Sequence, residues 1–221
     1  MAAGLAVLST FANPNGIWFG AGLTLASVCW LGTEVVGGHE YRRLRDAALA
    51  EEFTSDELKS LRSTGWRHID CVEFHRFDVD HVVVGPGGVV VVETKWTNVS
   101  WPIRDGEFVN RYARNAVIQA ARNAADIRSL LRWNFKIDVD VIPALMIWGD
   151  GRPSLDHPFR EQQGVIVATR SLLAAHLKNL NAVLTSARID EIYTAINKYV
   201  TDKEQLDRRK EHARNLATNH A

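Results

Sequence analysis

The chain is poor in cysteine, carries no net charge and begins with a long stretch that has no charged side chain. Cys29 and Cys71 are the only cysteines among its 221 residues. They lie far apart and lack metal-ligand spacing, so the sequence indicates no disulfide framework, and a reducing compartment is the simpler interpretation. With 26 basic and 26 acidic residues, the chain is not a globally cationic nucleic-acid binder, although a local basic patch is compatible with this balance.

Recognisable binding modules are also lacking. The sequence has no internal repeat, no low-complexity tract and no helix-turn-helix, zinc-finger or base-reading motif, so no sequence specificity is readable. Its length suffices for one sizeable domain with its own core and an appendage.

Residues 1–33 contain no Asp, Glu, Lys, Arg or His. A turn signal at 13–16 precedes an apolar run, and a helix over 17–38 would be roughly 33 Å long, enough to cross a hydrocarbon core. We therefore expect an N-terminal transmembrane helix there, although Glu34 is costly within a span unless it reaches the interface. A buried N-terminal helix is the alternative. A secretory signal is disfavoured, because no positive charge precedes the run.

The charges around this run predict its orientation. Three arginines follow it directly, at Arg42, Arg43 and Arg45, and the positive-inside rule then places the rest of the chain on the cytoplasmic side of the cell membrane. The expected organisation is a single-pass anchor in 1–38, a folded domain in 39–200 and a charged tail in 201–221.

Hydrophobic periodicity predicts an α/β domain. We expect helix over 39–63, strands near 68–72 and from 74 onwards, a loop or short strand pair over 98–110, helix over 111–133, strands over 137–148 and 164–168, and helices over 172–180 and 189–200.

The most informative stretch is 78–95, where two valine runs flank Gly85-Pro86-Gly87-Gly88. This pattern predicts a β-hairpin with a four-residue connection. If the hairpin closes symmetrically, Asp80 faces Glu93 and Asp78 faces Lys95. Because side chains alternate along strands, all four would emerge on one face.

Two opposed carboxylates repel each other unless a proton or a cation lies between them. Asp80 and Glu93 are hard oxygen ligands, suited to Mg²⁺ or Mn²⁺ rather than Zn²⁺. Lys95 would orient the attacking water or stabilise developing charge, which suits phosphodiester hydrolysis. The alternative is a solvated hairpin face with an ordinary Asp78–Lys95 pair.

The run DVDHVVVGPGGVVVVETKW resembles the core of the nuclease-related domain, which is placed in the PD-(D/E)xK nuclease superfamily. The superfamily pattern falls on Asp80 and on Glu93-Thr94-Lys95, and the resemblance covers roughly residues 45–175. It implies a restriction-endonuclease-like mixed sheet, built on a central β-hairpin and flanked by helices. It also implies a metal-dependent nuclease that acts on nucleic acid, with DNA expected and RNA left open.

The same resemblance suggests further site residues. Gln119, within 115–123, matches a glutamine in the helix after the hairpin, although a solvated amide is the alternative. An early acid is expected from the first helix, at Glu51 or Glu52. His81 should point to the opposite face from Asp80 and either be structural or support the site residues indirectly. The nearest basic side chains for substrate are Arg104, Arg111, Arg114 and Arg122.

The sequence therefore predicts a membrane-tethered, Mg²⁺-dependent nuclease-like domain. A catalytically silent, membrane-anchored nucleic-acid-binding or scaffold module of the same fold is the alternative.

Overall fold

The computed structural model describes residues 41–74, 77–161 and 163–218, with side chains described as far as residue 208. The chain divides into two compact units, Met1–Asp46 and Ala47–Ala221. The predicted membrane anchor at 17–38 lies outside the described residues. Within the described ranges, no helix is both long and apolar enough to cross a bilayer.

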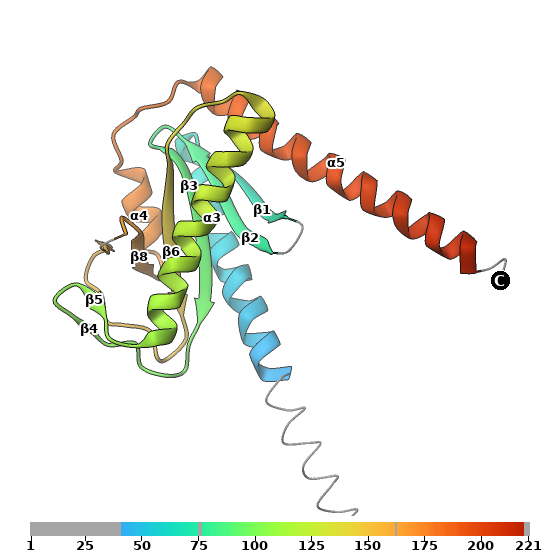
Figure 1. Ribbon diagram of the computed structural model, residues 1–221. Helices are drawn as coiled ribbons and strands as arrows, with labels where there is room; N and C mark the ends of the chain where they lie inside the picture. Colours follow the sequence, from blue (N-terminus) through green and yellow to red (C-terminus); the bar gives the residue numbers. More distant parts are fainter. Residues whose placement is uncertain (1–40, 75–76, 162, 219–221) are drawn as a thin grey trace, which may run out of the picture. The chain divides into compact units, whose positions relative to one another are not determined.

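A six-stranded mixed sheet forms the centre of the second unit (Figure 1). Its strands are β1 (Arg67–Glu73), β2 (Asp78–Gly85), β3 (Gly88–Trp96), β6 (Val141–Trp148), β7 (Phe159–Arg160) and β8 (Ile166–Thr169), in the order β1-β2-β3-β6-β8-β7. The pairs β1–β2, β2–β3 and β7–β8 are antiparallel, whereas β3–β6 and β6–β8 are parallel. The predicted mixed α/β architecture is confirmed.

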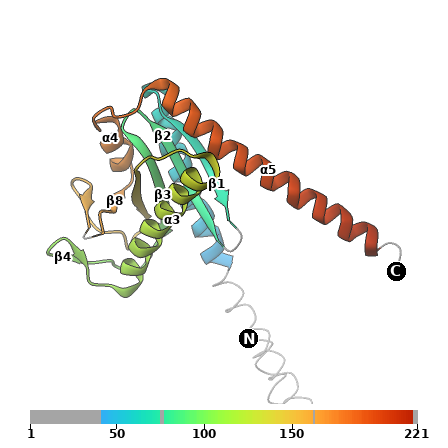
Figure 2. The same ribbon diagram turned by 45° about the horizontal axis from the view of Figure 1, so that its top comes forward.

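Helices cover both faces of this sheet (Figures 1 and 2). One face packs against α3 (Arg111–Phe135) and the first turns of α5 (Ser186–Thr218). The other packs against the helix over 47–59, the 3₁₀ helix η1 (Ser60–Thr64) and α4 (Leu172–Lys178). Layers on both faces explain the unbroken valine runs, because a strand buried on both sides needs apolar residues at every position.

The valines of the hairpin alternate between the two layers. Val82 and Val91 pack towards α3 and α5, whereas Val83 and Val90 pack towards 47–59 and α4. All four are fully buried, and burying each valine side chain contributes roughly 1.5–3 kcal/mol. These contacts fix which face receives each polar residue at the end of the hairpin.

The hairpin keeps the predicted register with a shorter turn. Val84 pairs with Val89 and Val82 with Val91, as expected. The predicted four-residue connection is wrong, because Gly85 pairs with Gly88 and only residues 86–87 form the turn. Gly88 has φ +125°, and a Cβ on Gly85 would lie 2.1 Å from the Trp66 ring. Glycine at both positions therefore lets the strands extend into the turn.

Other boundaries also differ from the sequence pattern. Strand β6 begins at Val141 rather than at 137, because Lys136 ends α3 with φ 60° and the Ile137 amide bonds back to the Leu131 carbonyl. The short pair β4 (Ile103–Arg104) and β5 (Glu107–Phe108) confirms the expected turn over 98–110.

Helix α5 begins at Ser186 and continues past the expected end at Val200 as far as Thr218. Residues 201–218 of the predicted charged tail therefore continue this helix. Lys203, near the middle of α5, binds the end of β1, because its ammonium lies 3.0 Å from both Glu73 Oε2 and the Phe74 carbonyl.

Candidate active site

The hairpin brings Asp80, Glu93 and Lys95 together. The Lys95 ammonium contacts Glu93 Oε1 at 2.5 Å, and Glu93 is 1% exposed. Asp80 Oδ2 accepts a hydrogen bond of 2.7 Å from the Thr94 amide. The hydrogen-bonded ladder ends at His81 and Val92, one residue before the acid pair, so the carboxylate of Asp80 bonds to the β3 backbone there.

Neighbouring charge and burial act against ionisation of this acid pair. Burial, followed by the charge of Glu93, raises the pKa of Asp80 to about 7. Burial also raises the pKa of Glu93, although Lys95 opposes this shift. Lys95 ion-pairs with Glu93, whereas the carboxylate of Asp80 is hydrogen-bonded only to a backbone amide among the described residues. The site therefore keeps an acid charge that a bound cation would compensate.

Asn123 is a site residue that the sequence analysis missed. It is 2% exposed on α3, and its Nδ2 donates to Glu93 Oε2 at 2.7 Å. Both oxygens of Glu93 are therefore held, one by Lys95 and one by Asn123. Gln119 lies one helical turn earlier but is exposed, and its side chain forms no hydrogen bond or ion pair with the described residues. The assisting role of Gln119 stays a prediction. Asn123 lies four residues after Gln119 on the same side of the helix, and this spacing could have identified it.

The helix over 47–59 supplies a third acidic residue, Glu51, whose charge acts on this pair. The charge of Glu51 raises the pKa of both Asp80 and Glu93. Burial raises the pKa of Glu51 itself, although Lys95 opposes the shift. Of the two candidates, Glu51 is therefore the one whose charge acts on the cluster, and its role as the early acid stays a prediction.

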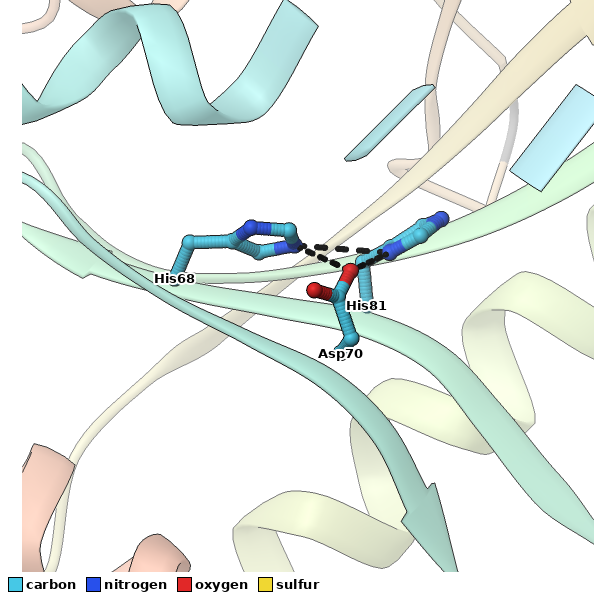
Figure 3. A group of neighbouring side chains, drawn as sticks. All are labelled: His68, Asp70 and His81. Atoms are coloured by element: carbon cyan, nitrogen blue, oxygen red, sulfur yellow. Dashed lines mark hydrogen bonds and ion pairs between the residues drawn. The ribbon is translucent and has the colours of Figure 1, made fainter. Parts of the chain in front are cut away.

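A second polar cluster lies between β1, β2 and the helix over 47–59 (Figure 3). His68 Nε2 and His81 Nδ1 lie 3.1 and 3.0 Å from Asp70 Oδ1, and 3.4 Å from each other. Both histidines are buried, whereas the Asp70 side chain is 51% exposed. Burial lowers the pKa of His68 to about 4 and also lowers that of His81. Both imidazoles are therefore neutral at pH 7.

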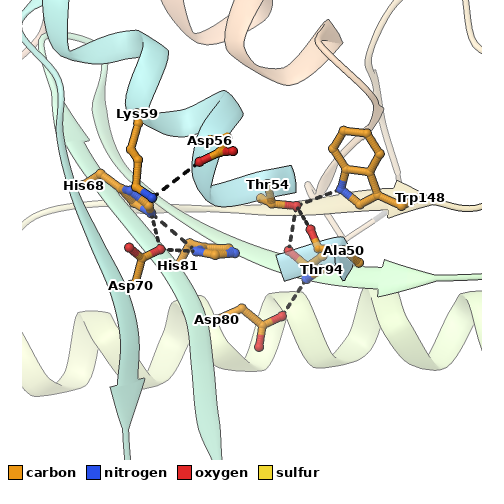
Figure 4. Close-up of polar contacts among 10 residues, drawn as sticks. All are labelled: Ala50, Thr54, Asp56, Lys59, His68, Asp70, Asp80, His81, Thr94 and Trp148. Atoms are coloured by element: carbon orange, nitrogen blue, oxygen red, sulfur yellow. Dashed lines mark hydrogen bonds and ion pairs between the residues drawn. The ribbon is translucent and has the colours of Figure 1, made fainter. Parts of the chain in front are cut away.

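The two clusters lie on opposite sides of β2 (Figure 4). Asp80 and His81 are consecutive, and strand alternation turns them to opposite faces, as predicted for His81. Thr54 ties the helix above them to the sheet. It donates to the Ala50 carbonyl and contacts Thr94 Oγ1 at 3.2 Å and Trp148 Nε1 at 2.8 Å. This buried hydroxyl fixes the helix that carries Glu51.

The four basic candidates for substrate contact differ in their surroundings. Arg114 donates to the carbonyls of Phe108 and Val109. Arg122 lies 3.7 Å from Asp126 and stacks over the Phe77 ring. Arg104 and Arg111 are exposed and form no ion pair with the described residues, so these two are available to bind phosphate.

The acid pair fits a hard divalent cation. Its donors are carboxylate oxygens, and Mg²⁺ is typically held by one or two carboxylates together with waters and substrate phosphates. The raised pKa of Asp80 gives a physical reason for metal binding, because a cation would favour the ionised form.

Comparison with known proteins agrees with this geometry. Residues 47–148 match the family model of the nuclease-related domain, and this range holds Glu51, both acids of the pair and Asn123. No curated protein and no solved structure matches the chain. The family predicted from the hairpin is confirmed: residues 47–148 belong to the nuclease-related domain family, which falls within the broader PD-(D/E)xK nuclease superfamily.

Proposed function

We propose that this protein is a metal-dependent nuclease that hydrolyses phosphodiester bonds in nucleic acid, with DNA as the expected substrate. Mg²⁺ is the proposed cofactor, and Mn²⁺ would substitute for it. The observation that carries the proposal is the buried acid pair beside Lys95, at the end of the hairpin that the family pattern identifies.

The chain's own residues would divide the chemistry among them. Asp80 and Glu93 would hold the ion, which when bound would polarise a phosphoryl oxygen and make a bound water more acidic. The Thr94 amide orients Asp80, and Asn123 orients Glu93. Lys95 would place its positive charge where negative charge develops on the phosphoryl oxygens. Gln119 would assist on contact with substrate.

We further propose that residues 17–38 tether this domain to the cell membrane with the nuclease-like part on the cytoplasmic side. The length of the uncharged run and the arginines after it support the proposal. Membrane fractionation of the full chain, beside a variant with arginines at Leu23 and Leu25, tests it. We expect only the parent chain in the membrane fraction, and equal partitioning of the two would remove the anchor.

The nuclease proposal is tested by incubating the full chain with single-stranded DNA, duplex DNA and RNA, in Mg²⁺, Mn²⁺ or EDTA. Glu93→Gln is the inactive comparison, and Glu107→Gln, in the short strand β5, is the matched control. We expect cleavage that needs metal, persists in the control and falls at least roughly 10³-fold in Glu93→Gln.

The outcomes separate the two functional hypotheses. Cleavage of one substrate class would also identify the substrate. Folded parent protein that cleaves nothing under any condition, yet retains nucleic acid, would favour the catalytically silent binding module. Cleavage at the parental rate by Glu93→Gln would contradict the assignment of the site.

A further inference from the structure

The cluster of His68, Asp70 and His81 is separate from the acid pair and has a composition of its own. Two imidazole nitrogens and one carboxylate oxygen meet there. This donor set suits Zn²⁺ or a similar transition ion, whereas the all-oxygen pair of Asp80 and Glu93 suits Mg²⁺.

We infer that His68 Nε2, His81 Nδ1 and Asp70 Oδ1 form a second metal site that takes Zn²⁺, with water as the fourth ligand.

The spacing of the three donor atoms carries this inference. They lie 3.0, 3.1 and 3.4 Å apart. Two ligands of a tetrahedral Zn²⁺ with bonds of about 2.05 Å are separated by about 3.3 Å, which is 1.63 times the bond length. The triangle therefore has the size of one face of a zinc tetrahedron. Binding would need only small side-chain adjustments.

The strand register positions this triangle. Asp70 and His81 are direct partners in the β1–β2 ladder. His68 lies two residues before Asp70, on the same face of the sheet. The ligands therefore belong to two paired strands rather than to a loop. An ion held there would tie β1 to β2 beside Asp80.

Access and charge state also suit a metal. The two histidines are buried, but the half-exposed Asp70 leaves the cluster open to solvent on one side. Neutral imidazole nitrogens are common metal ligands, and both rings direct one nitrogen towards Asp70 Oδ1. Burial alone would raise the pKa of Asp70, but the hydrogen bond from Ser55, the charge of His68 and the hydrogen bond with His81 together lower it.

A metal-free hydrogen-bonded cluster is the competing explanation. In that arrangement either both imidazole N–H groups donate to Asp70 Oδ1, or His81 Nδ1 bonds to that oxygen while His68 Nε2 bonds to His81 Nδ1. The first case crowds two hydrogens on one side of the oxygen, and the second relies on a ring-to-ring contact of 3.4 Å. His81 Nε2 is buried without a partner among the described residues. It stays so in both arrangements and does not decide between them.

One neighbouring charge opposes the ion. Lys59 lies near the cluster (Figure 4), and its charge lowers the pKa of both His68 and His81. Asp56 lies 3.5 Å from the Lys59 ammonium and partly offsets it. Removing the charge of Lys59 should therefore strengthen metal binding, whereas a simple hydrogen-bonded cluster predicts no zinc affinity to strengthen.

The test uses the full chain without a histidine tag, stripped with a chelator and titrated with Zn²⁺ and Co²⁺. We expect one equivalent of tight binding, the visible absorption of tetrahedral Co²⁺, and a rise in Tm on the order of 5 °C at a hundredfold excess over Kd. His68→Gln and His81→Gln should weaken binding at least roughly 100-fold. His157→Gln, an exposed histidine outside the cluster, is the matched control.

Three further variants make the test decisive. Asp70→Asn changes a half-exposed residue and should also lose the Co²⁺ spectrum. It therefore serves as the test if the buried histidine variants do not fold. Lys59→Gln should tighten Zn²⁺ binding several-fold. Glu93→Gln should keep it, which separates this site from the proposed nuclease centre. No stoichiometric binding to folded parent protein, or equal binding in parent and Asp70→Asn, would overturn the inference.

Discussion

Two polar clusters lie on opposite faces of β2. They differ in the charge states of their buried groups. Towards α3, two carboxylates lie close together beside one lysine, and the pKa of Asp80 is raised. Towards the helix over 47–59, two imidazoles remain neutral around one ionised carboxylate. The first arrangement offers carboxylate oxygens alone, whereas the second offers two imidazole nitrogens and one carboxylate oxygen. This difference explains why the two clusters are expected to take different ions.

After Glu93→Gln, the largest effect should come from Lys95→Met, which removes the ammonium group beside the acid pair. We expect cleavage to fall roughly 10²–10³-fold, because charge on the phosphoryl oxygens loses its partner. Mg²⁺ binding should persist, since both carboxylates remain. Single-turnover cleavage assays and calorimetry measure the two quantities. Lys178→Met, an exposed lysine in α4, is the control, and an unchanged rate in Lys95→Met would remove this lysine from the mechanism.

The next largest effect is expected for Asn123→Ala. Loss of the hydrogen bond to Glu93 Oε2 should lower cleavage by roughly 10–100-fold, as for other residues that orient a metal ligand. It should also destabilise the fold by about 1–3 kcal/mol, because a buried carboxylate oxygen loses its donor. Denaturant titration measures the second effect. Asn115→Ala, on the exposed side of the same helix, should change neither quantity.

Glu51 should have a smaller effect, visible mainly in the pH profile. Its charge raises the pKa of Asp80 and Glu93, so Glu51→Gln should move the acidic limb of the cleavage profile to lower pH. We expect a change in rate of roughly tenfold or less at neutral pH. Glu52→Gln is the adjacent control, and equal shifts in the two variants would contradict the assignment of Glu51.

The smallest expected effect is on stability, measured in EDTA. The two clusters should change the free energy of unfolding with pH in opposite directions. The pKa of Asp80, about 7, lies above its ordinary value of 3.8. Its contribution to stability is therefore present below about pH 4 and is lost as the pH rises to about 7. The pKa of His68, about 4, lies below its ordinary value of 6.5. Its contribution is present above about pH 6.5 and is lost as the pH falls to about 4.

Two substitutions expose these opposite slopes. Relative to the parent, the free energy of unfolding should rise more with pH in Asp80→Asn and less in His68→Gln, each by on the order of 1 kcal/mol across pH 4–7. Urea titrations at several pH values measure the slopes. Slopes that change in the same direction in both variants would contradict the proposed charge states.

The difference between the clusters also explains what the sequence could reveal. The pairing of Asp80 with Glu93 was predictable, because both lie in one hairpin whose register follows from local turn residues. His68 and Asp70 lie in another strand, and only the β1–β2 register brings them to His81. Asn123 comes from a helix separated from the hairpin by further chain, and its spacing from Gln119 was the one available signal.

Element boundaries were also predicted incompletely where contacts outside the local sequence decide them. Alternation of Asp138 and Asp140 with valines favoured a strand from 137. Instead, Lys136 ends α3 in a left-handed conformation and the Ile137 amide donates to the Leu131 carbonyl, so the residues that follow form the connection to β6. The two-residue strand β7 was not predicted, because it is too short to show an alternating pattern and is defined only by its pairing with β8.

Calorimetric titration of Mg²⁺ into the full chain at pH 8, beside Asp80→Asn, tests the central claim most directly. The account predicts one binding event in the parent, with proton release that grows as the pH falls towards 7, and loss of that event in Asp80→Asn. Equal binding by the two proteins, or no binding by folded parent, would contradict the claim that the hairpin acids form a metal centre.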